Sequence, residues 1–122
     1  HQCSFISSAA VNCKQFMRRS SGRNNKHQDD AEKIVQTTME YRIDKILDIA
    51  VRNGHDGIVL GAFGCGVFGN DPIIISDIFA SLLAGKYKFG FKKIRFSILK
   101  RNEKDKSFEK FVEAIKRHFG DD

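Results

Sequence analysis

The stretch GIVLGAFGCGVFGNDP, residues 57–72, is the most informative part of this 122-residue sequence. It opens with a short apolar run bounded by glycine, which is typical of a buried strand. It closes with Asp71 and Pro72, residue types preferred at the N-cap and first position of a helix. Glycines stand at positions 61, 64, 66 and 69 between the two ends. The stretch therefore predicts a strand, a glycine-rich loop and a helix.

Such a loop can bind an anion through its backbone. Glycines permit positive φ and close approach of a ligand, two properties that we expect Gly66 to need. Successive N–H groups can then converge on a phosphate beside the positive end of a helix dipole. The loop has no Lys, Arg, Ser or Thr between Gly61 and Gly69, so it lacks the P-loop pattern. GCGVFG has the spacing of a Rossmann fingerprint, but Asp77 falls in the next predicted helix rather than after a second strand.

Two interpretations of the loop remain open from its residues alone. In the first, it binds a diphosphate, and Phe63 and Phe68 pack on a ribose or a base. In the second, it is a tight turn between a strand and a helix in a protein whose site lies elsewhere. The first is favoured because ligands gather outside the carboxyl ends of strands in open α/β sheets.

The run LGAFGCGVFGNDP closely resembles the phosphate loop of the microbial-type poly(ADP-ribose) glycohydrolases, a branch of the macrodomain superfamily. The preceding EYRIDKILDIAVRNGHDGIVLGA resembles the helix that leads into that loop. SFISSAAVN is similar to the family's hydrophobic strand ending in Ala-Ala-x-Asn. IFASLLAGKYKFGFKKIRFSIL resembles the family's helix and final strand. The resemblance spans roughly residues 3–115.

This resemblance implies a macrodomain-like three-layer α/β/α fold with a mostly parallel sheet. Residues 1–122 would form a single domain that matches the C-terminal half of the catalytic domain, with a truncated N-terminal half. Backbone N–H groups of residues 64–68 would hold the diphosphate of ADP-ribose or poly(ADP-ribose), and Phe68 would pack on the distal ribose. ADP-ribosylated proteins are the implied partners, and neither a cofactor nor a metal is implied. The expected ligand-binding residues are Gly61, Ala62, Phe63, Gly64, Cys65, Gly66, Val67, Phe68, Gly69, Asn70 and Asn12.

A second motif of the family is absent from this sequence. Members carry three glycines followed by Gln-Glu-Glu, whose second glutamate is implied to act as general acid in cleaving the ribose–ribose bond. The 122 residues contain neither Gly-Gly-Gly nor Glu-Glu, so no catalytic residue is assigned. Two functions stay open: a glycohydrolase that hydrolyses ADP-ribose linkages when complete, and an inactive ADP-ribose reader or protein-interaction fragment.

Composition limits the class of protein. With 41% hydrophobic and 30% charged residues, the chain is an ordinary globular domain, and a net charge of +6 favours acidic partners. The three cysteines show neither disulfide-scaffold nor zinc-site spacing, which favours an intracellular compartment, cytoplasmic or nuclear. No run approaches the ~18 apolar residues of a membrane span. The basic zone Lys86–Arg101 has no RNA-recognition or helix-turn-helix signature beside it, so nucleic acid is not an expected partner.

The remaining elements follow from apolar periodicity. Residues 3–11 are apolar and small and predict a first strand. Residues 14–28 carry five Lys/Arg and no acid, and predict a basic loop that is either a flap over an anionic ligand or a solvated insertion. Further strands are predicted at 57–62 and 92–99, and helices at 29–53, 73–85 and 105–118. The order β-α-β-α-β-α indicates a parallel α/β sheet.

The resemblance also implies how the strands pair. Residues 57–62 should pair on one side with 94–99 and, on the other, with a strand of the N-terminal half that lies between them and residues 3–11. An apolar strand with an open edge invites association. We therefore expect direct pairing of residues 3–11 with 57–62, pairing supplied by another chain, or aggregation through the unpaired edge.

Other chemically reactive residues show weak patterns. Cys65 precedes a predicted helix N-terminus, where the pKa of a thiol can be lowered, but the favoured interpretation is a small residue fitted between glycines. The histidines have no partner at triad-like spacing; they are His1, His27, His55 and His118.

Overall fold

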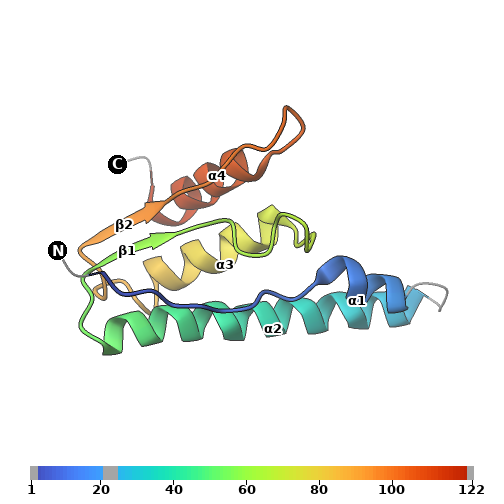
Figure 1. The fold of residues 1–122 in the computed structure, drawn as a ribbon, viewed down its shortest axis with the longest axis horizontal. Helices are drawn as coiled ribbons and strands as arrows, with labels where there is room; N and C mark the ends of the chain where they lie inside the picture. The colour runs from blue at the N-terminus through green and yellow to red at the C-terminus, as the bar shows by residue number, and fades with distance from the viewer. Residues whose placement is uncertain (1–2, 21–24, 121–122) are drawn as a thin grey trace.

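The computed structural model describes residues 3–20 and 25–120. In these residues the elements follow in the order α1 (Cys13–Ser20), α2 (Asn25–Arg52), β1 (Gly57–Leu60), α3 (Pro72–Ala84), β2 (Lys93–Phe96) and α4 (Ser107–Phe119), as Figure 1 shows. The two strands are parallel, and Gly57 to Leu60 lie opposite Lys93 to Phe96. The α/β fold class and the predicted pairing of residues 57–62 with 94–99 are confirmed.

The core is built around three aromatic rings. Phe79 of α3 lies 5.7 Å from Phe96 of β2 and 6.2 Å from Phe111 of α4, measured between ring centroids. The rings of Phe96 and Phe111 are 5.3 Å apart. Such aromatic pairs contribute about 0.5–1.5 kcal/mol each beyond the burial of their area. This cluster packs β2 against α3, which precedes it in the chain, and α4, which follows it.

Helix α2 begins earlier than predicted. Its buried face follows a helical stripe, because Met39, Ile43 and Leu47 are fully buried. Asp is a residue type preferred at helix N-termini, so Asp29 and Asp30 favour a start at residue 29, but both lie inside the helix, which starts at Asn25. The position of α2 is therefore decided by its buried stripe rather than by the acidic pair.

The basic loop predicted at residues 14–28 is wrong for most of its length. Residues 13–20 form α1, and residues 25–28 belong to α2. Asn12 explains the first helix, because its Oδ1 accepts a hydrogen bond from the N–H of Gln15 at 3.1 Å and so caps the N-terminus. Residues 21–24 of the predicted loop lie outside the described residues.

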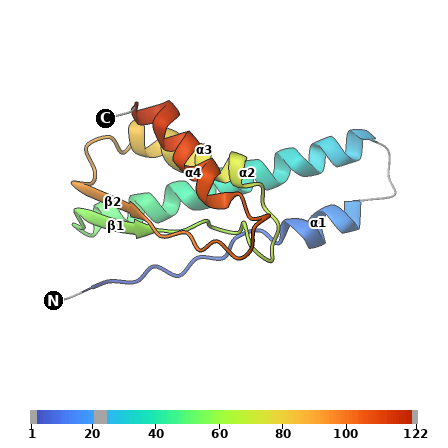
Figure 2. The same ribbon diagram turned by 90° about the horizontal axis from the view of Figure 1, so that it is seen from above.

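The strand predicted at residues 3–11 is also wrong. The segment is extended, but no strand in the described part of the chain pairs with it, and its direct pairing with residues 57–62 does not occur. Without a partner its apolar side chains stay in solvent, and Phe5 is 91% exposed. Figure 2 shows this segment passing the strands on the side opposite α3 and α4. Among residues 3–20 and 25–120 no helix combines the length and apolarity that a membrane crossing requires.

Candidate functional site

The glycine-rich loop, residues 61–71, joins the carboxyl end of β1 to the start of α3 (Figure 1). The helix start is the predicted one, since the N–H of Ile73 donates to Asp71 Oδ1 at 2.9 Å and Pro72 occupies the first turn. The helix ends before Gly85. The loop is therefore held between a paired strand and a capped helix.

Short-range hydrogen bonds give the loop its shape. Four backbone bonds of 2.9–3.0 Å fold it into tight turns, from the N–H groups of Phe63, Cys65, Gly69 and Asn70 to the carbonyl oxygens of Gly61, Ala62, Gly66 and Gly64 respectively. Because these bonds lie within the loop, its conformation is set before any ligand arrives.

Several backbone donors of the loop are left without an acceptor among the described residues. The N–H groups of residues 66–68, together with that of Gly64, have no acceptor in the described part of the chain. The N–H of Cys65 is already bonded within the loop, so it drops out of the predicted set of phosphate donors. An unsatisfied row of backbone N–H groups beside a helix start is the arrangement that binds phosphate.

Positive φ is needed at two of the loop's glycines. Gly64 has φ of 76° and Gly69 has φ of 73°. A Cβ on Gly64 would lie 2.6 Å from Ala10 Cβ, and one on Gly69 would lie 2.6 Å from Lys14 Cγ. These two glycines are therefore required by the fold itself.

Gly66 differs from these two, and the expectation of positive φ there is wrong. A Cβ on Gly66 would have Arg101 Nη1, at 3.7 Å, as its nearest neighbour. The fold would accept a side chain at this position. A substitution of Gly66 can therefore test whether a ligand approaches the backbone here without disturbing the fold.

Asn70 ties the N-terminal segment to the loop. It is 3% exposed, and its Nδ2 donates to Val11 O at 2.8 Å and to Gly64 O at 2.9 Å. A second link is the hydrogen bond from the N–H of Lys14 to Phe68 O at 3.0 Å. The side chain of Asn70 is thus committed to holding the loop, and a ligand would meet the surface around it.

The side chains of the predicted site divide into buried and exposed ones. Phe63 packs against the core, whereas Phe68 is 38% and Val67 is 81% exposed. Asn12 lies beside the loop at the start of α1, with its Oδ1 used for capping. Gly61 and Ala62 are half-buried. The structure therefore brings all the predicted residues to one region and leaves Phe68 and Val67 at its surface.

Cys65 is not an activated thiol. It is 7% exposed, and burial raises its pKa to about 12. The nearby carboxylates of Asp71 and Asp105 contribute less to this rise in pKa, and Arg101 opposes it. The interpretation of Cys65 as a small buried residue among glycines is confirmed.

Sequence reasoning missed two charged clusters. Arg101, at the end of the basic zone, reaches Gly66 of the loop from a distant part of the sequence. His118, which has no partner at triad-like spacing in the sequence, has its Nε2 2.7 Å from Asp77 Oδ1, and Arg117 Nη2 lies 3.1 Å from the same oxygen. Hydrogen bonds from His118 and then Arg117 lower the pKa of Asp77. Arg101 pairs with Asp105, and the only sign of this pair in the sequence is their four-residue separation. Such a spacing is common between charged residues on protein surfaces and does not by itself indicate a site.

A separate hollow of about 560 Å³ lies between α2 and α3. Its lining mixes Asp44, Asp77, Lys86 and Arg117, which are used in ion pairs across the helices. Within the described ranges no three His, Cys, Asp or Glu side chains gather as a metal site. The glycine loop therefore remains the best-formed candidate site.

Comparison with solved structures gives a consistent match. Poly(ADP-ribose) glycohydrolase from Deinococcus radiodurans in complex with ADP-ribose aligns with a TM-score of 0.78 and 24% identity, over 90% of this chain and 41% of that one. The apo form of the same enzyme aligns with a TM-score of 0.74 and 25% identity, over 90% of this chain and 42% of that one. Poly(ADP-ribose) glycohydrolase from Thermomonospora curvata aligns with a TM-score of 0.63 and 30% identity, over 80% of this chain and 35% of that one. No protein-family model and no curated protein matches the sequence.

These matches define the chain as an α/β protein of the macrodomain type. More narrowly, it has the macrodomain fold of the microbial poly(ADP-ribose) glycohydrolases. The chain spans about 41% of the length of the Deinococcus enzyme.

Proposed function

We propose that this chain binds the diphosphate of ADP-ribose, free or within poly(ADP-ribose), at the glycine-rich loop. The observation that carries the proposal is the row of N–H groups at residues 66–68 that lack an acceptor in the described part of the chain. The preformed turns and the capped start of α3 hold this row outside the carboxyl end of β1. The ADP-ribose complex of the Deinococcus neighbour supports the choice of ligand.

In this proposal the loop backbone holds the phosphates and the exposed side chains hold the sugar. Phe68 packs on the distal ribose, and Val67 covers the ligand from the solvent side. Residues 61–63, Cys65, Asn70 and Asn12 shape the floor and the rim. ADP-ribosylated proteins in an intracellular compartment are the proposed partners, and binding needs no cofactor or metal.

Hydrolysis is proposed only for a protein that also carries the Gly-Gly-Gly and Gln-Glu-Glu motif. The sequence of 122 residues has no adjacent glutamates to serve as general acid. Acidic residues that could be considered instead, Asp29, Asp30, Glu32 and Asp56, are exposed and lie outside the loop. An inactive ADP-ribose reader, or a protein-interaction fragment, is the second candidate.

The two candidates make opposite predictions when the chain is combined with the missing motif. Alone, the purified chain should release no ADP-ribose from poly(ADP-ribose), measured by chromatography of the products. Fused to an upstream segment that carries the motif, it should become active if the first candidate is right. Robust turnover by the chain alone would contradict the assignment of no catalytic residue.

Binding itself is tested by calorimetry with ADP-ribose and adenosine. ADP-ribose should bind and adenosine should bind much more weakly, because only the former has a diphosphate. Gly66→Val should abolish ADP-ribose binding while leaving the melting temperature nearly unchanged, since a Cβ there meets only Arg101 Nη1 at 3.7 Å. Equal affinities for the two ligands, or an unaffected Gly66→Val variant, would contradict the proposal.

A further inference from the structure

Arg101 places a cation at a loop that has none of its own. No Lys or Arg occurs between Gly61 and Gly69. Arg101 follows β2, and its Nη1 lies 3.7 Å from the position of a Cβ on Gly66. The end of its guanidinium therefore stands beside the glycine that the fold leaves open to a ligand.

Asp105 fixes the direction of this guanidinium. Its Oδ2 accepts both the backbone N–H of Arg101 at 3.1 Å and the Nε–H of the same residue at 3.0 Å. Its Oδ1 accepts the N–H of Ser107, the first residue of α4, at 3.0 Å. The carboxylate thus joins Arg101 to the start of a helix, and Asp105 is 8% exposed.

The carboxylate that holds Arg101 is ionised at neutral pH. Hydrogen bonds from the backbone N–H groups of Ser107 and Arg101 hold the pKa of Asp105 well below its usual range. The charges of this pair also act on the pKa of the Cys65 thiol in the loop, which Asp105 raises and Arg101 lowers.

The bonded Nε leaves the outer end of the guanidinium available. Neither Nη1 nor Nη2 of Arg101 has an acceptor in the described part of the chain, and the side chain is 49% exposed. A guanidinium presents its donors as a planar fork that matches phosphate oxygens. Its Nη1 lies beside Gly66, the first of the three consecutive residues whose N–H groups lack an acceptor in the described part of the chain.

We propose that Arg101, oriented by Asp105, binds a phosphate of the diphosphate over Gly66 and so makes the loop selective for diphosphate-containing ligands. This inference rests on the proposed function, because it assigns a residue to the same site. Arg101 supplies the positive charge that the loop lacks, and Asp105 is a positioning residue that does not itself touch the ligand.

The test is calorimetry of the full chain with ADP-ribose and adenosine. Arg101→Gln should weaken ADP-ribose binding at least about tenfold, the range for a hydrogen bond to a charged group, and leave adenosine binding unchanged. The loss of affinity between about 0.05 and 0.3 M NaCl should be smaller in the variant, because screening has one charge fewer to act on. Arg101→Lys should lie between the two, since it keeps the charge without the fork.

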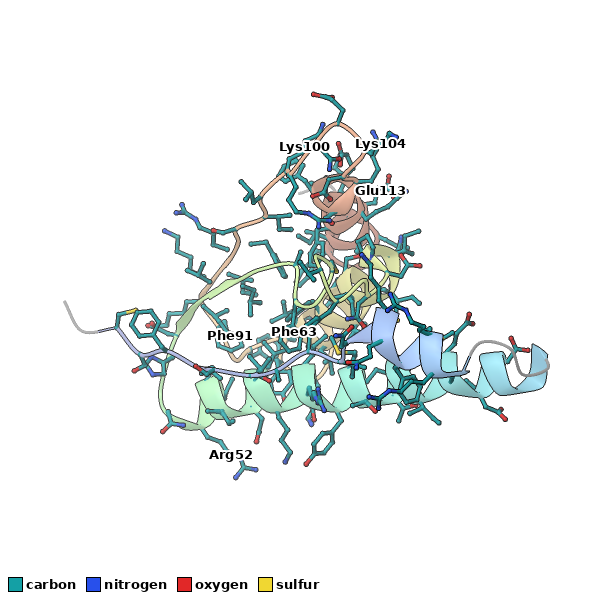
Figure 3. The ribbon with its side chains drawn as sticks, turned by 45° about the vertical axis from the view of Figure 1, so that its right-hand side comes forward. Arg52, Phe63, Phe91, Lys100, Lys104 and Glu113 are labelled. Atoms are coloured by element: carbon teal, nitrogen blue, oxygen red, sulfur yellow. The ribbon has the colours of Figure 1, made fainter. Side chains whose placement is uncertain are left out.

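Arg52→Gln is the matched control. Arg52 Nε bonds Asp48 Oδ2 at 2.8 Å, so the substitution removes an arginine–aspartate ion pair of the same four-residue separation. Figure 3 shows Arg52 below α2, on the other side of the molecule from the turn that bears Lys100 and Lys104. This variant should bind ADP-ribose as the wild type does.

The outcomes separate the two claims. If the wild-type chain does not bind ADP-ribose, the proposed function fails and the inference fails with it. If the wild type binds and Arg101→Gln binds equally well, only the inference is overturned. If Arg101→Gln weakens ADP-ribose and adenosine by the same factor, Arg101 has a structural role and the inference is again overturned.

Discussion

Two apolar stretches of the sequence lead toward the glycine loop, and only one of them forms a paired strand in the described part of the chain. Residues 57–60 form β1, which pairs with β2 and buries Leu60 to 8% exposure. Residues 3–9 are extended and exposed, with Phe5 at 91%. Each stretch leads toward a capped helix, through Asp71 in one case and Asn12 in the other.

The difference is the presence of a hydrogen-bonding partner. Apolar residues favour a strand only where another strand satisfies the backbone and a packed face covers the side chains. β1 has both, from β2 and from the core around Phe79. In the described part of the chain, the hydrogen bonds that tie the N-terminal segment to other elements lie near its end, where Arg42 Nη1 donates to Ala9 O at 2.8 Å and Asn70 bonds Val11 O. The sequence pattern of the two stretches is similar, and their surroundings decide the outcome.

The largest expected effect is a stability difference between matched truncations in the two stretches. Leu60→Ala should lower the free energy of unfolding by about 3 kcal/mol, because it empties a buried site. Ile6→Ala, at a side chain that is 40% exposed, should change it by less than about 0.5 kcal/mol. Urea unfolding of both variants measures the contrast. Similar losses would mean that the N-terminal segment is packed as tightly as β1.

A smaller loss of stability is expected from a substitution at Asn70, the residue that ties the N-terminal segment to the glycine loop. Asn70→Ala should cost about 2 kcal/mol, because it removes the donor that serves Val11 O and leaves that carbonyl without its partner. The control is Asn53→Ala, which removes one exposed bond to Ile49 O and should change stability by less than about 0.5 kcal/mol. Equal effects in urea unfolding would show that the N-terminal segment is not held through Asn70.

Local patterns predicted the fold where the local chemistry is sufficient. The Asp71-Pro72 pair predicted the start of α3, and Met39 and Leu47, which belong to the apolar pattern that predicted α2, are fully buried. The same reasoning missed α1, because a basic stretch with Ser, Gly and Asn was interpreted as a loop although Asn12 caps it. The strand at 3–11 failed because pairing is a property of two segments.

The candidate site was predictable in its position and less so in its contacts. The glycine pattern placed a loop at the carboxyl end of a strand, which the structure has. Which glycines need positive φ depends on neighbours such as Ala10 and Lys14, and these come from a distant part of the chain. Arg101 could not be assigned for the same reason, since only the fold brings it to Gly66.

The most direct test of the central claim follows the backbone amides of the loop by NMR during titration with ADP-ribose. The amide resonances of Gly66, Val67 and Phe68 should shift most, because their N–H groups lack an acceptor in the described part of the chain. That of Cys65 should shift less, since it already donates to Ala62 O at 3.0 Å. Adenosine should leave all of them nearly unchanged. Saturable shifts confined to other parts of the chain, with residues 66–68 unaffected, would contradict the assignment of this loop as the diphosphate site.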